Sequence, residues 1–204
     1  MKKIDLKKQY QQLYKASAKS AAIVDVPRLN YLMVDGQGDP NDALFSEAVA
    51  ALYGVSYTLK FTFKKGKEAI DYPVMALEGL WWMEGIKGFD ATARDKWKWT
   101  LMILQPEIVT EDIFQQAREE VIKKKGLPIL SKLRLENFYE GLAAQIMHLG
   151  PYATEGPTIE KLHGFVKEMG YQLTGKHHEI YLGDPRKSAP EKLKTILRHP
   201  VKLG

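Results

Sequence analysis

The segment His177-His178-Glu179-Ile180-Tyr181-Leu182-Gly183-Asp184-Pro185 decides how the rest of the chain is interpreted. Its alternation predicts a β-strand in which His177, Glu179 and Tyr181 point to one face and the intervening residues to the other. The sequence Gly183-Asp184-Pro185 is typical of a turn and ends the strand. A carboxylate between an imidazole and a phenol indicates a face with chemical or binding potential. The alternative is an edge strand with a solvated polar face, which this segment alone favours.

Composition indicates a soluble globular protein. The chain has 204 residues, of which 27% are charged and 45% hydrophobic, enough for one large domain or two small ones with a substantial core. It contains no cysteine, which excludes disulfides, thiolate metal sites and cysteine nucleophiles. The first eight residues lack the apolar run of a signal peptide, and no segment approaches the length of a membrane span. We therefore expect a cytoplasmic protein without a membrane partner.

The net charge of +5 is distributed along the chain. Basic residues occur in four separate stretches, Lys2–Lys15, Lys60–Lys67, Lys123–Lys125 and Arg186–Lys202. Such spacing is typical of solvated faces rather than of a continuous nucleic-acid-binding stripe. We expect no nucleic-acid partner, and the stretch 186–198 is interpreted as structural because apolar residues alternate with its lysines.

The first half of the chain contains helical and extended patterns. An amphipathic helix is predicted over 3–16, followed by extended structure over 21–34 that breaks at Pro27-Arg28. A helix then begins with Asp39 as N-cap and Pro40 in its first turn. Residues 56–63 either extend this helix or begin a strand, and the sequence does not distinguish the two. Strands are expected over 72–83 and 97–104.

The second half follows a similar plan. A helix over 110–125 and a short helical stretch over 129–133 lead to extended residues 138–149. A helix over 157–169 and strands over 171–182 and 193–201 complete the chain. Each half therefore reads strand, helix, strand, strand, and short similar segments such as Leu52-Tyr53-Gly54-Val55 and Leu162-His163-Gly164-Phe165 occur in matching places.

This repetition predicts an internal duplication within one domain covering residues 1–204. The expected fold class is α+β: an N-terminal module of about 20–105, a linker helix of about 110–125 and a C-terminal module of about 135–201. We expect these two β-α-β-β modules to be related by a pseudo-twofold axis. The groove between them would then be a central ligand cleft.

Two carboxylates and several aromatic residues are candidate site residues. Glu78 and Glu179 occupy equivalent strand positions, and we expect both to edge the cleft. Trp81 and Trp82 are consecutive, so they point in opposite directions and at least one should face away from the covering helices. The alternative for these tryptophans is ordinary core packing. A carboxylate beside an aromatic wall suits a flat, apolar or cationic ligand.

No other motif indicates chemistry. The five histidines lack HxxxH or HExxH spacing, and the adjacent His177 and His178 project to opposite faces, so we expect no zinc site. The sequence has no GxSxG elbow, P-loop or dinucleotide-binding fingerprint. We therefore expect no metal or organic cofactor.

Longer segments resemble a known family. The run from Gly175 to Lys187, GKHHEIYLGDPRK, continued by Ala189 to Arg198, is similar to the C-terminal signature of the GyrI-like small-molecule-binding family, in its stand-alone bacterial branch. The segments Val34–Pro40, Glu78–Trp82 and Gly150–Tyr152 also resemble that branch. The resemblance covers nearly the whole chain and implies two β-α-β-β modules around a central ligand cleft.

The resemblance also implies a function. Some relatives are ligand-sensing domains of transcription activators. We expect no such role here, because the two modules and their linker occupy the sequence and leave no segment for a helix-turn-helix. Similar stand-alone members include hydrolases that open the cyclopropane of cyclopropanoid natural products, a detoxifying activity. By this resemblance Glu179 would be the general base, and Tyr181 or Tyr139 would hydrogen-bond the substrate carbonyl. From their strand positions, rather than from the resemblance, we expect the ligand-binding residues to be Glu78, Trp81, Trp82, Tyr72, Tyr181 and His177.

The alternative function is a non-catalytic binder that sequesters lipophilic, often cationic, drug-like molecules, with Glu179 as a counter-charge. In both cases the expected partner is a small hydrophobic or aromatic molecule. The sequence indicates neither the physiological ligand nor the oligomeric state.

Overall fold

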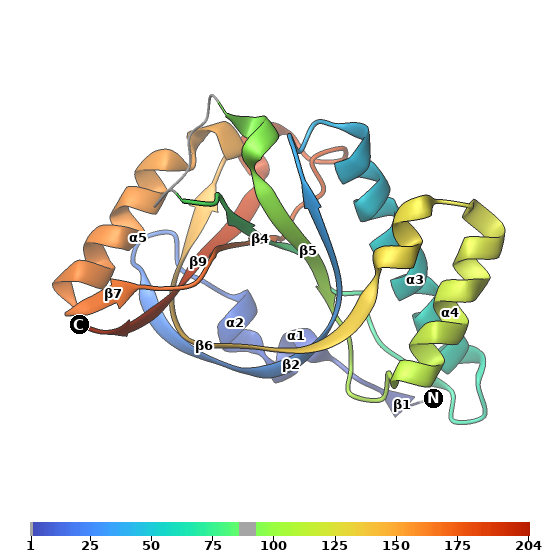
Figure 1. Ribbon diagram of the computed structural model, residues 1–204. Coiled ribbons are helices and arrows are strands. Elements are labelled where there is room, and N and C mark those ends of the chain that lie inside the picture. Colours follow the sequence, from blue (N-terminus) through green and yellow to red (C-terminus); the bar gives the residue numbers. More distant parts are fainter. Residues whose placement is uncertain (1, 86–92) are drawn as a thin grey trace. The chain divides into compact units, whose positions relative to one another are not determined.

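The computed structural model describes residues 2–85 and 93–204, which form an α+β protein (Figure 1). Two compact units are present. Unit 1 comprises Met1–Gln9, Leu29–Leu77 and Trp82–Phe138, and unit 2 comprises Tyr10–Arg28, Glu78–Trp81 and Tyr139–Gly204. Three strands, β2 (Ala22–Gln37), β4 (Leu77–Trp82) and β6 (Arg134–Leu149), contribute residues to both units.

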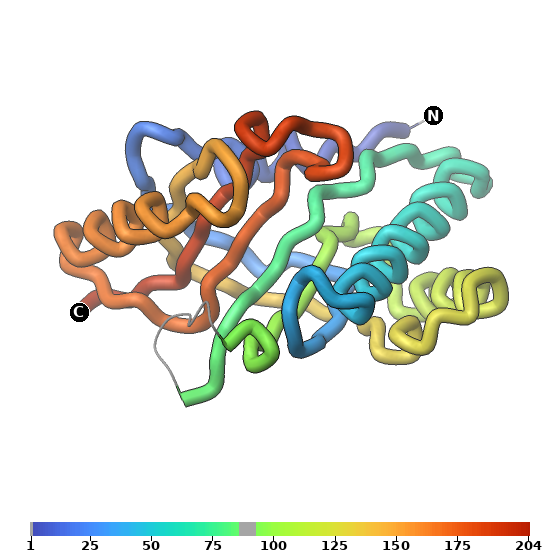
Figure 2. Tube along the Cα trace, turned by 90° about the horizontal axis from the view of Figure 1, so that it is seen from above, coloured from blue at the N-terminus to red at the C-terminus, as the bar shows by residue number. Residues whose placement is uncertain are grey.

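Unit 1 is built on an antiparallel strand pair and two long helices. Strand β2 pairs with β5 (Lys98–Leu104) from Tyr31 opposite Leu104 to Gln37 opposite Lys98. Helix α3 (Ala43–Lys65) packs against β5 and against α4 (Glu111–Lys125), and the two helices lie side by side in Figures 1 and 2. The smaller elements are β1 (Lys2–Lys3), α1 (Leu6–Gln9), β3 (Ile70–Asp71), η1 (Arg94–Lys96) and η2 (Pro128–Lys132).

Unit 2 is organised around its last strand, β9 (Lys194–Leu203), which pairs antiparallel with three others. These are β6, β7 (Tyr171–Leu173) and β8 (His177–Tyr181). Helix α5 (Gly156–Glu168) covers one face of this sheet (Figure 1). The remaining elements are α2 (Gln11–Tyr14), η3 (Tyr152–Thr154) and η4 (Pro190–Lys192).

The core of unit 2 follows from the amphipathic character of α5. Its buried stripe, Leu162 and Val166, packs onto Ala144 and Ile146 of β6 and Leu197 of β9. Residues three and four apart in a helix lie on one face, and alternate residues of a strand do the same, so both patterns meet in one apolar layer. This apolar layer therefore holds α5 against the sheet that contains β8 and β9.

Several predicted elements differ from those observed. The amphipathic segment 3–16 forms β1 and two short helices rather than one helix, and Pro27 does not interrupt β2. A proline is tolerated in a strand where its nitrogen need not donate a ladder hydrogen bond. Residues 56–63 continue α3. The prediction of Asp39 as N-cap is wrong, because the helix begins at Ala43 with Asp42 as N-cap. Asp39 instead accepts a hydrogen bond from the backbone N–H of Asn41 in the preceding turn. The strand expected over 72–83 begins only at Leu77.

The strand expected over 171–182 is divided into β7 and β8. Leu173 of β7 pairs with Val201 of β9, and His178 of β8 pairs with Arg198 of β9. The chain therefore advances five residues from Leu173 to His178 while β9 advances only three, so the register shifts between β7 and β8. Pro200 cannot donate a ladder hydrogen bond. A Cβ added to Gly175 would lie 3.2 Å from the ring of Pro200, so a larger residue would be crowded there. Gly175 adopts a positive φ of 60°, which lets the chain bulge at this point.

The predicted order of elements recurs in the structure. The first half reads β2, α3, β4, β5, and the second reads β6, α5, β8, β9, with the short β3 and β7 added. The two compact units do not coincide with these halves, because Glu78–Trp81 belongs to unit 2. The pseudo-twofold relation and the single-domain organisation stay predictions.

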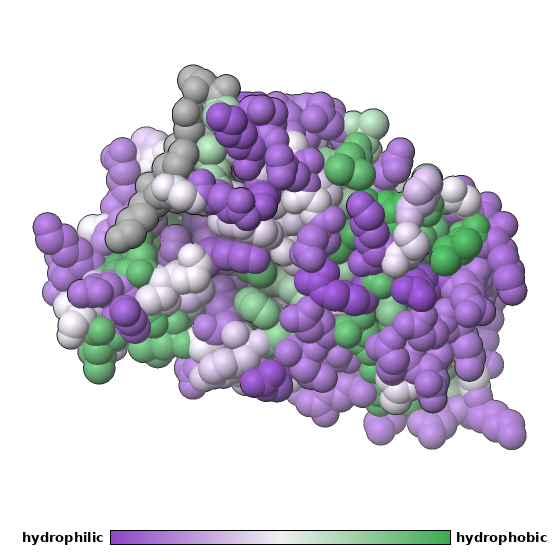
Figure 3. Space-filling model, in the orientation of Figure 1, coloured by the Kyte–Doolittle hydropathy of each residue, from purple (hydrophilic) through white to green (hydrophobic). Residues whose placement is uncertain are grey.

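Figure 3 shows a face carrying mostly hydrophilic side chains, in keeping with the 27% of charged residues. Within residues 2–85 and 93–204, the helices are too short or too polar to cross a membrane.

A glycine on β2 provides a test of the packing in unit 1. A Cβ added to Gly36 would lie 2.1 Å from the ring of Trp99, which is fully buried and packs edge-on against Phe45 at 5.3 Å between ring centroids. We expect Gly36→Ala to lower the free energy of unfolding by about 1–3 kcal/mol, because Trp99 has no space to move. Urea unfolding followed by tryptophan fluorescence measures this. Gly164→Ala, in α5 where an added Cβ meets nothing within 4 Å, serves as the control and should not destabilise. Equal stability of Gly36→Ala and the unchanged protein would contradict the packing described.

Candidate functional site

Strand β8 carries different chemistry on its two faces. As the alternation predicts, His177, Glu179 and Tyr181 share one face and His178 and Ile180 share the other. In the antiparallel register with β9, Tyr181 lies opposite Thr195 and Glu179 opposite Leu197, so these four belong to the face covered by α5. His178 lies opposite Arg198 on the reverse face. Two polar clusters of unit 2 therefore lie back to back across one strand.

The first cluster is centred on the carboxylate of Glu179. The hydroxyl of Tyr181 donates a hydrogen bond of 2.7 Å to Glu179 Oε2, and Trp81 Nε1 donates one of 2.9 Å to the same hydroxyl. His177 Nε2 lies 3.2 Å from Glu179 Oε1. The Glu179 side chain is 15% exposed, so solvent or a ligand has limited access to it. The carboxylate is thus oriented by a phenol that is itself held in place by an indole.

Gly79 makes this arrangement sterically feasible. A Cβ at position 79 would lie 2.8 Å from Trp81 Nε1 and 3.2 Å from the Tyr181 hydroxyl oxygen. Both distances are too short for a methyl group beside atoms fixed by hydrogen bonds. Strand β4 lies next to β8 in the sheet, and Gly79 of β4 lies beside the Trp81–Tyr181 hydrogen bond. No local sequence pattern identified this role of Gly79.

The electrostatic surroundings keep Tyr181 protonated. Burial raises the pKa of Tyr181 well above its ordinary value of 10, and the negative charge of Glu179 raises that pKa further. A neutral phenol can donate to Glu179 and accept from Trp81 at the same time. The ring of Tyr152 packs edge-on against Tyr181, with 5.6 Å between centroids. Together these contacts fix the direction of the Tyr181 O–H bond.

Glu155 is a second carboxyl beside this cluster, and it was not among the predicted site residues. It is 6% exposed, and among the described residues its Oε1 has no hydrogen-bond partner. Burial, reinforced by the charge of Glu179, raises the pKa of Glu155 to about 9. Thr195 lies close enough to Glu155 to lower that pKa, although within the described residues Thr195 Oγ1 has no hydrogen-bond partner. Glu155 is therefore a protonated acid near neutral pH.

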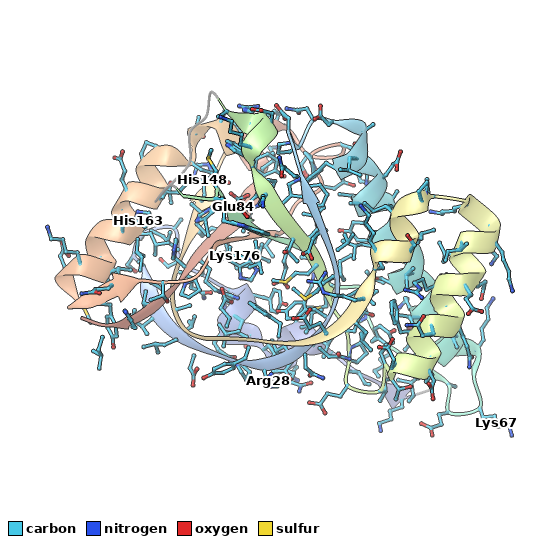
Figure 4. All side chains as sticks on the ribbon, in the orientation of Figure 1. Arg28, Lys67, Glu84, His148, His163 and Lys176 are labelled. Carbon is cyan, nitrogen blue, oxygen red and sulfur yellow. The ribbon has the colours of Figure 1, made fainter. Side chains whose placement is uncertain are left out.

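His148 holds the turn that carries Glu155. Its Nδ1 lies 2.9 Å from Thr158 Oγ1 in α5, and its Nε2 is 3.3 Å from both the Pro151 carbonyl and Thr154 Oγ1. In Figure 4, His148 lies near the start of α5 and His163 lies further along that helix. The backbone carbonyl of Glu155 also accepts hydrogen bonds from the first turn of α5. The position of the Glu155 backbone is thus fixed from both sides.

The second cluster, on the reverse face of β8, is fully buried. Both ring nitrogens of His178 lie within hydrogen-bond distance of a glutamate: Glu78 Oε2 lies 3.0 Å from Nε2 and Glu140 Oε1 lies 2.9 Å from Nδ1. Arg198 reaches Glu140 Oε2 at 3.2 Å, and Tyr14 donates to Glu78. The pKa of His178 is raised and that of Glu140 is lowered to about 2, because burial is outweighed by the opposite charges. We call these residues the His178 network.

The expectation that Glu78 and Glu179 edge one cleft is wrong. Glu78 is fully buried and bonds to His178, whereas Glu179 lies on the opposite face of β8 with Tyr181. The two glutamates occupy matching places in the element order, but their side chains point to different sides of the unit 2 sheet. Glu78 therefore belongs to the His178 network, and its ligand-binding role stays a prediction.

The other predicted site residues divide into two groups. Trp81, Tyr181 and His177 lie beside Glu179 in unit 2. Tyr72 and Trp82 belong to unit 1, and their ligand-binding role stays a prediction. Tyr139 is 57% exposed with the guanidinium of Arg28 5.6 Å from its ring centroid, and among the described residues it makes no hydrogen bond to Glu179. Its catalytic role also stays a prediction.

His177, which lies beside Glu179, belongs to a chain of three neighbouring histidine rings. The rings of His177 and His199 are 6.0 Å apart and those of His163 and His199 are 5.5 Å apart, measured between centroids. Burial, with the neighbouring histidines, lowers the pKa of His199 to about 3, so it is neutral at physiological pH. Within the part of the chain that the structure describes, no group of three or more histidine, aspartate or glutamate side chains has a metal-binding arrangement.

Comparison with known proteins identifies the family. The sequence profile of the GyrI-like small molecule binding domain matches residues 21–202, nearly the whole chain. The protein therefore belongs to the GyrI-like family, whose domain binds small molecules. A comparison with curated proteins found no match.

Solved structures support the assignment. An uncharacterised conserved protein from Listeria innocua is 43% identical, with a TM-score of 0.90 over 98% of this chain and 100% of that chain. A hydrolase from Listeria innocua is 40% identical, with a TM-score of 0.85 and the same coverage. The C-terminal domain of EcmrR, 12% identical with a TM-score of 0.58 over 91% of this chain and 98% of that one, shares the fold alone.

Proposed function

We propose that this protein is a hydrolase that opens the cyclopropane ring of small cyclopropanoid molecules, with Glu179 as the general base. The observation that carries the proposal is the arrangement at Glu179: a carboxylate 15% exposed, oriented by the Tyr181 hydroxyl at 2.7 Å. The similarity to a Listeria innocua hydrolase at 40% identity supports a hydrolytic reaction. A detoxifying role follows if the substrates are alkylating agents.

The reaction requires one activated water molecule. Glu179 removes a proton from water while the water oxygen bonds to the cyclopropyl methylene carbon. The strained C–C bond breaks, and its electron pair moves through the conjugated system onto the carbonyl oxygen, which then takes up a proton. Ring strain and conjugation lower the barrier, so a placed base and an oriented substrate are sufficient. The product is the substrate plus one water.

The neighbours of Glu179 serve orientation. Tyr181 fixes Oε2, and in this proposal Oε1, which lies 3.2 Å from His177 Nε2, is the oxygen that accepts the proton from water. The aromatic rings of Trp81, Tyr152 and Tyr181 offer flat apolar surfaces that suit a planar conjugated substrate. In this proposal Tyr181 positions the base, because its hydroxyl already donates a hydrogen bond to Glu179.

A second candidate function is non-catalytic binding of lipophilic cations. It is favoured by the same partly buried carboxylate, which lies beside aromatic rings and would neutralise a ligand cation. The two functions differ in one outcome, the formation of product.

The first experiment therefore measures product formation by the unaltered protein. A spirocyclopropyl cyclohexadienone is incubated with the protein near neutral pH, and the hydroxyethyl phenol formed by ring opening is quantified by chromatography and mass spectrometry. We expect the rate to exceed the buffer rate by at least about 100-fold, the contribution typical of one positioned base. Heat-denatured protein is the control. Saturable binding of the dienone without ring opening would contradict the hydrolase and favour the binder.

A further inference from the structure

We infer that Glu155 is a catalytic acid of this site: its carboxyl donates a proton to the oxygen on which negative charge develops while Glu179 accepts one from water. The inference rests on the proposed function and adds a second catalytic residue to it. It also narrows the substrate class to compounds whose strained ring is conjugated to a carbonyl oxygen that can reach this acid.

The burial of Glu155 has no structural explanation among the described residues. The residue stands immediately before α5, where an acidic side chain usually accepts hydrogen bonds from the first backbone N–H groups of a helix. Here the side chain makes no such capping bond, and Oε1 has no hydrogen-bond partner within the described residues. A buried carboxyl oxygen without a hydrogen-bond partner costs free energy of folding, on the order of 1–3 kcal/mol. Retaining it there is typical of a group that meets a ligand.

The groups around Glu155 favour its role as the acid, beside Glu179 as the base. From β8 the charge of Glu179 acts on Glu155, and Tyr181 on the same strand also interacts electrostatically with it. From β9 only the uncharged Thr195 faces it, and on β6 His148 binds the turn before α5. No cation among the groups acting on Glu155 in the described structure compensates a second negative charge. The buried Glu155 therefore carries the proton that the proposed reaction needs from an acid.

Two such carboxyls complete the proton balance of the reaction. Water gives its proton to Glu179 as its oxygen bonds to the methylene carbon. The electrons of the broken C–C bond reach the carbonyl oxygen, and Glu155 transfers its proton to that oxygen. After the step Glu179 is protonated and Glu155 is ionised, and exchange with solvent restores the starting state. These reaction steps require neither an oxidant nor a metal.

The test is the pH dependence of turnover in Glu155→Gln, with the spirocyclopropyl cyclohexadienone as substrate. The unaltered protein should lose kcat above about pH 9, where Glu155 loses its proton. The glutamine still donates a hydrogen bond but cannot transfer a proton, so we expect kcat near neutral pH to fall about tenfold and the alkaline decline to disappear. Glu160→Gln, which removes an exposed carboxylate from the same helix, should retain both the rate and the decline.

A second measurement does not depend on turnover. Infrared spectra near neutral pH should show the C=O stretch of a protonated carboxylic acid in the unaltered protein and in Glu160→Gln. The band should be absent in Glu155→Gln and should vanish above about pH 9 in the unaltered protein. Hydrolysis by Glu155→Gln with the rate and alkaline decline of the unaltered protein would overturn the acid role and leave the proposed function intact. Absence of hydrolysis by the unaltered protein would overturn both, and absence of the band would overturn the protonated state.

Discussion

Glu179→Gln is expected to reduce the turnover of a spirocyclopropyl cyclohexadienone by a factor of about 100 or more, the loss typical of a removed general base. The glutamine keeps the size of the side chain and can still accept the hydrogen bond from Tyr181, but it cannot take a proton from water. Affinity for the neutral dienone should change little, because the substrate carries no charge that pairs with Glu179. Steady-state kinetics separate the two effects as a fall in kcat at nearly constant KM.

The matched control for this substitution is Glu191→Gln, which removes an exposed carboxylate elsewhere in unit 2 and should not change turnover. Thermal unfolding of each variant verifies that the fold persists. Full activity of Glu179→Gln would exclude Glu179 as the base. A loss of affinity for a lipophilic cation, in a protein without turnover, would instead assign Glu179 the role of a counter-charge.

Arg198→Met should lower the free energy of unfolding by about 3–5 kcal/mol, the typical cost of removing one partner from a buried ionic cluster. Arg198 is 1% exposed and reaches Glu140, the Gln145 side chain and the Leu13 carbonyl. Methionine fills a similar length but leaves these acceptors without their donor. Urea unfolding near neutral pH measures the difference. Arg186→Met, which breaks an exposed pair with Asp184, is the control and should cost only about 0–1 kcal/mol.

The contribution of the His178 network should also depend on pH in a defined direction. The pKa of Glu140 is lowered from 4.5 to about 2, so its ionised form stabilises the fold above its unfolded-state pKa. That stabilisation is lost as the pH falls through about 2. The advantage of the unaltered protein over Arg198→Met should therefore shrink between about pH 6 and about pH 2. The raised pKa of His178 has the opposite pH dependence. The stabilisation by protonated His178 is fully present below pH 6.5 and is lost as the pH rises through the pKa of His178 in the folded protein. A difference independent of pH would contradict the ionic account.

The sequence predicted β8 and the face of each of its residues, because a two-residue period is a local property of the chain. It could not predict that Glu78 bonds to His178 rather than facing Glu179, since that depends on how β4 is placed beside β8. The role of Gly79 depends on the same neighbouring pair. Glu155 escaped detection for a different reason: it lies between a turn and a helix, where no periodicity distinguishes a buried side chain from an exposed one.

The N-terminal segment illustrates a further limit. The spacing of Leu6, Leu13 and Tyr14 is compatible with one amphipathic helix, but the chain forms two short helices in different units. In unit 2, the carbonyls of Gln12 and Leu13 accept hydrogen bonds from Gln145 and Arg198, which lie more than a hundred residues away. Long-range hydrogen bonds of this kind override a weak local preference for helix.

The back-to-back arrangement on β8 has a consequence for how this protein can evolve. Under the proposed function, substitutions at positions 177, 179 and 181 would alter ligand chemistry, whereas those at the buried positions 178 and 180 would alter the core of unit 2. A lineage can therefore change substrates through alternate positions while neighbouring positions remain under selection for folding. The same five-residue strand thus permits new specificities to appear without a concurrent loss of the native state.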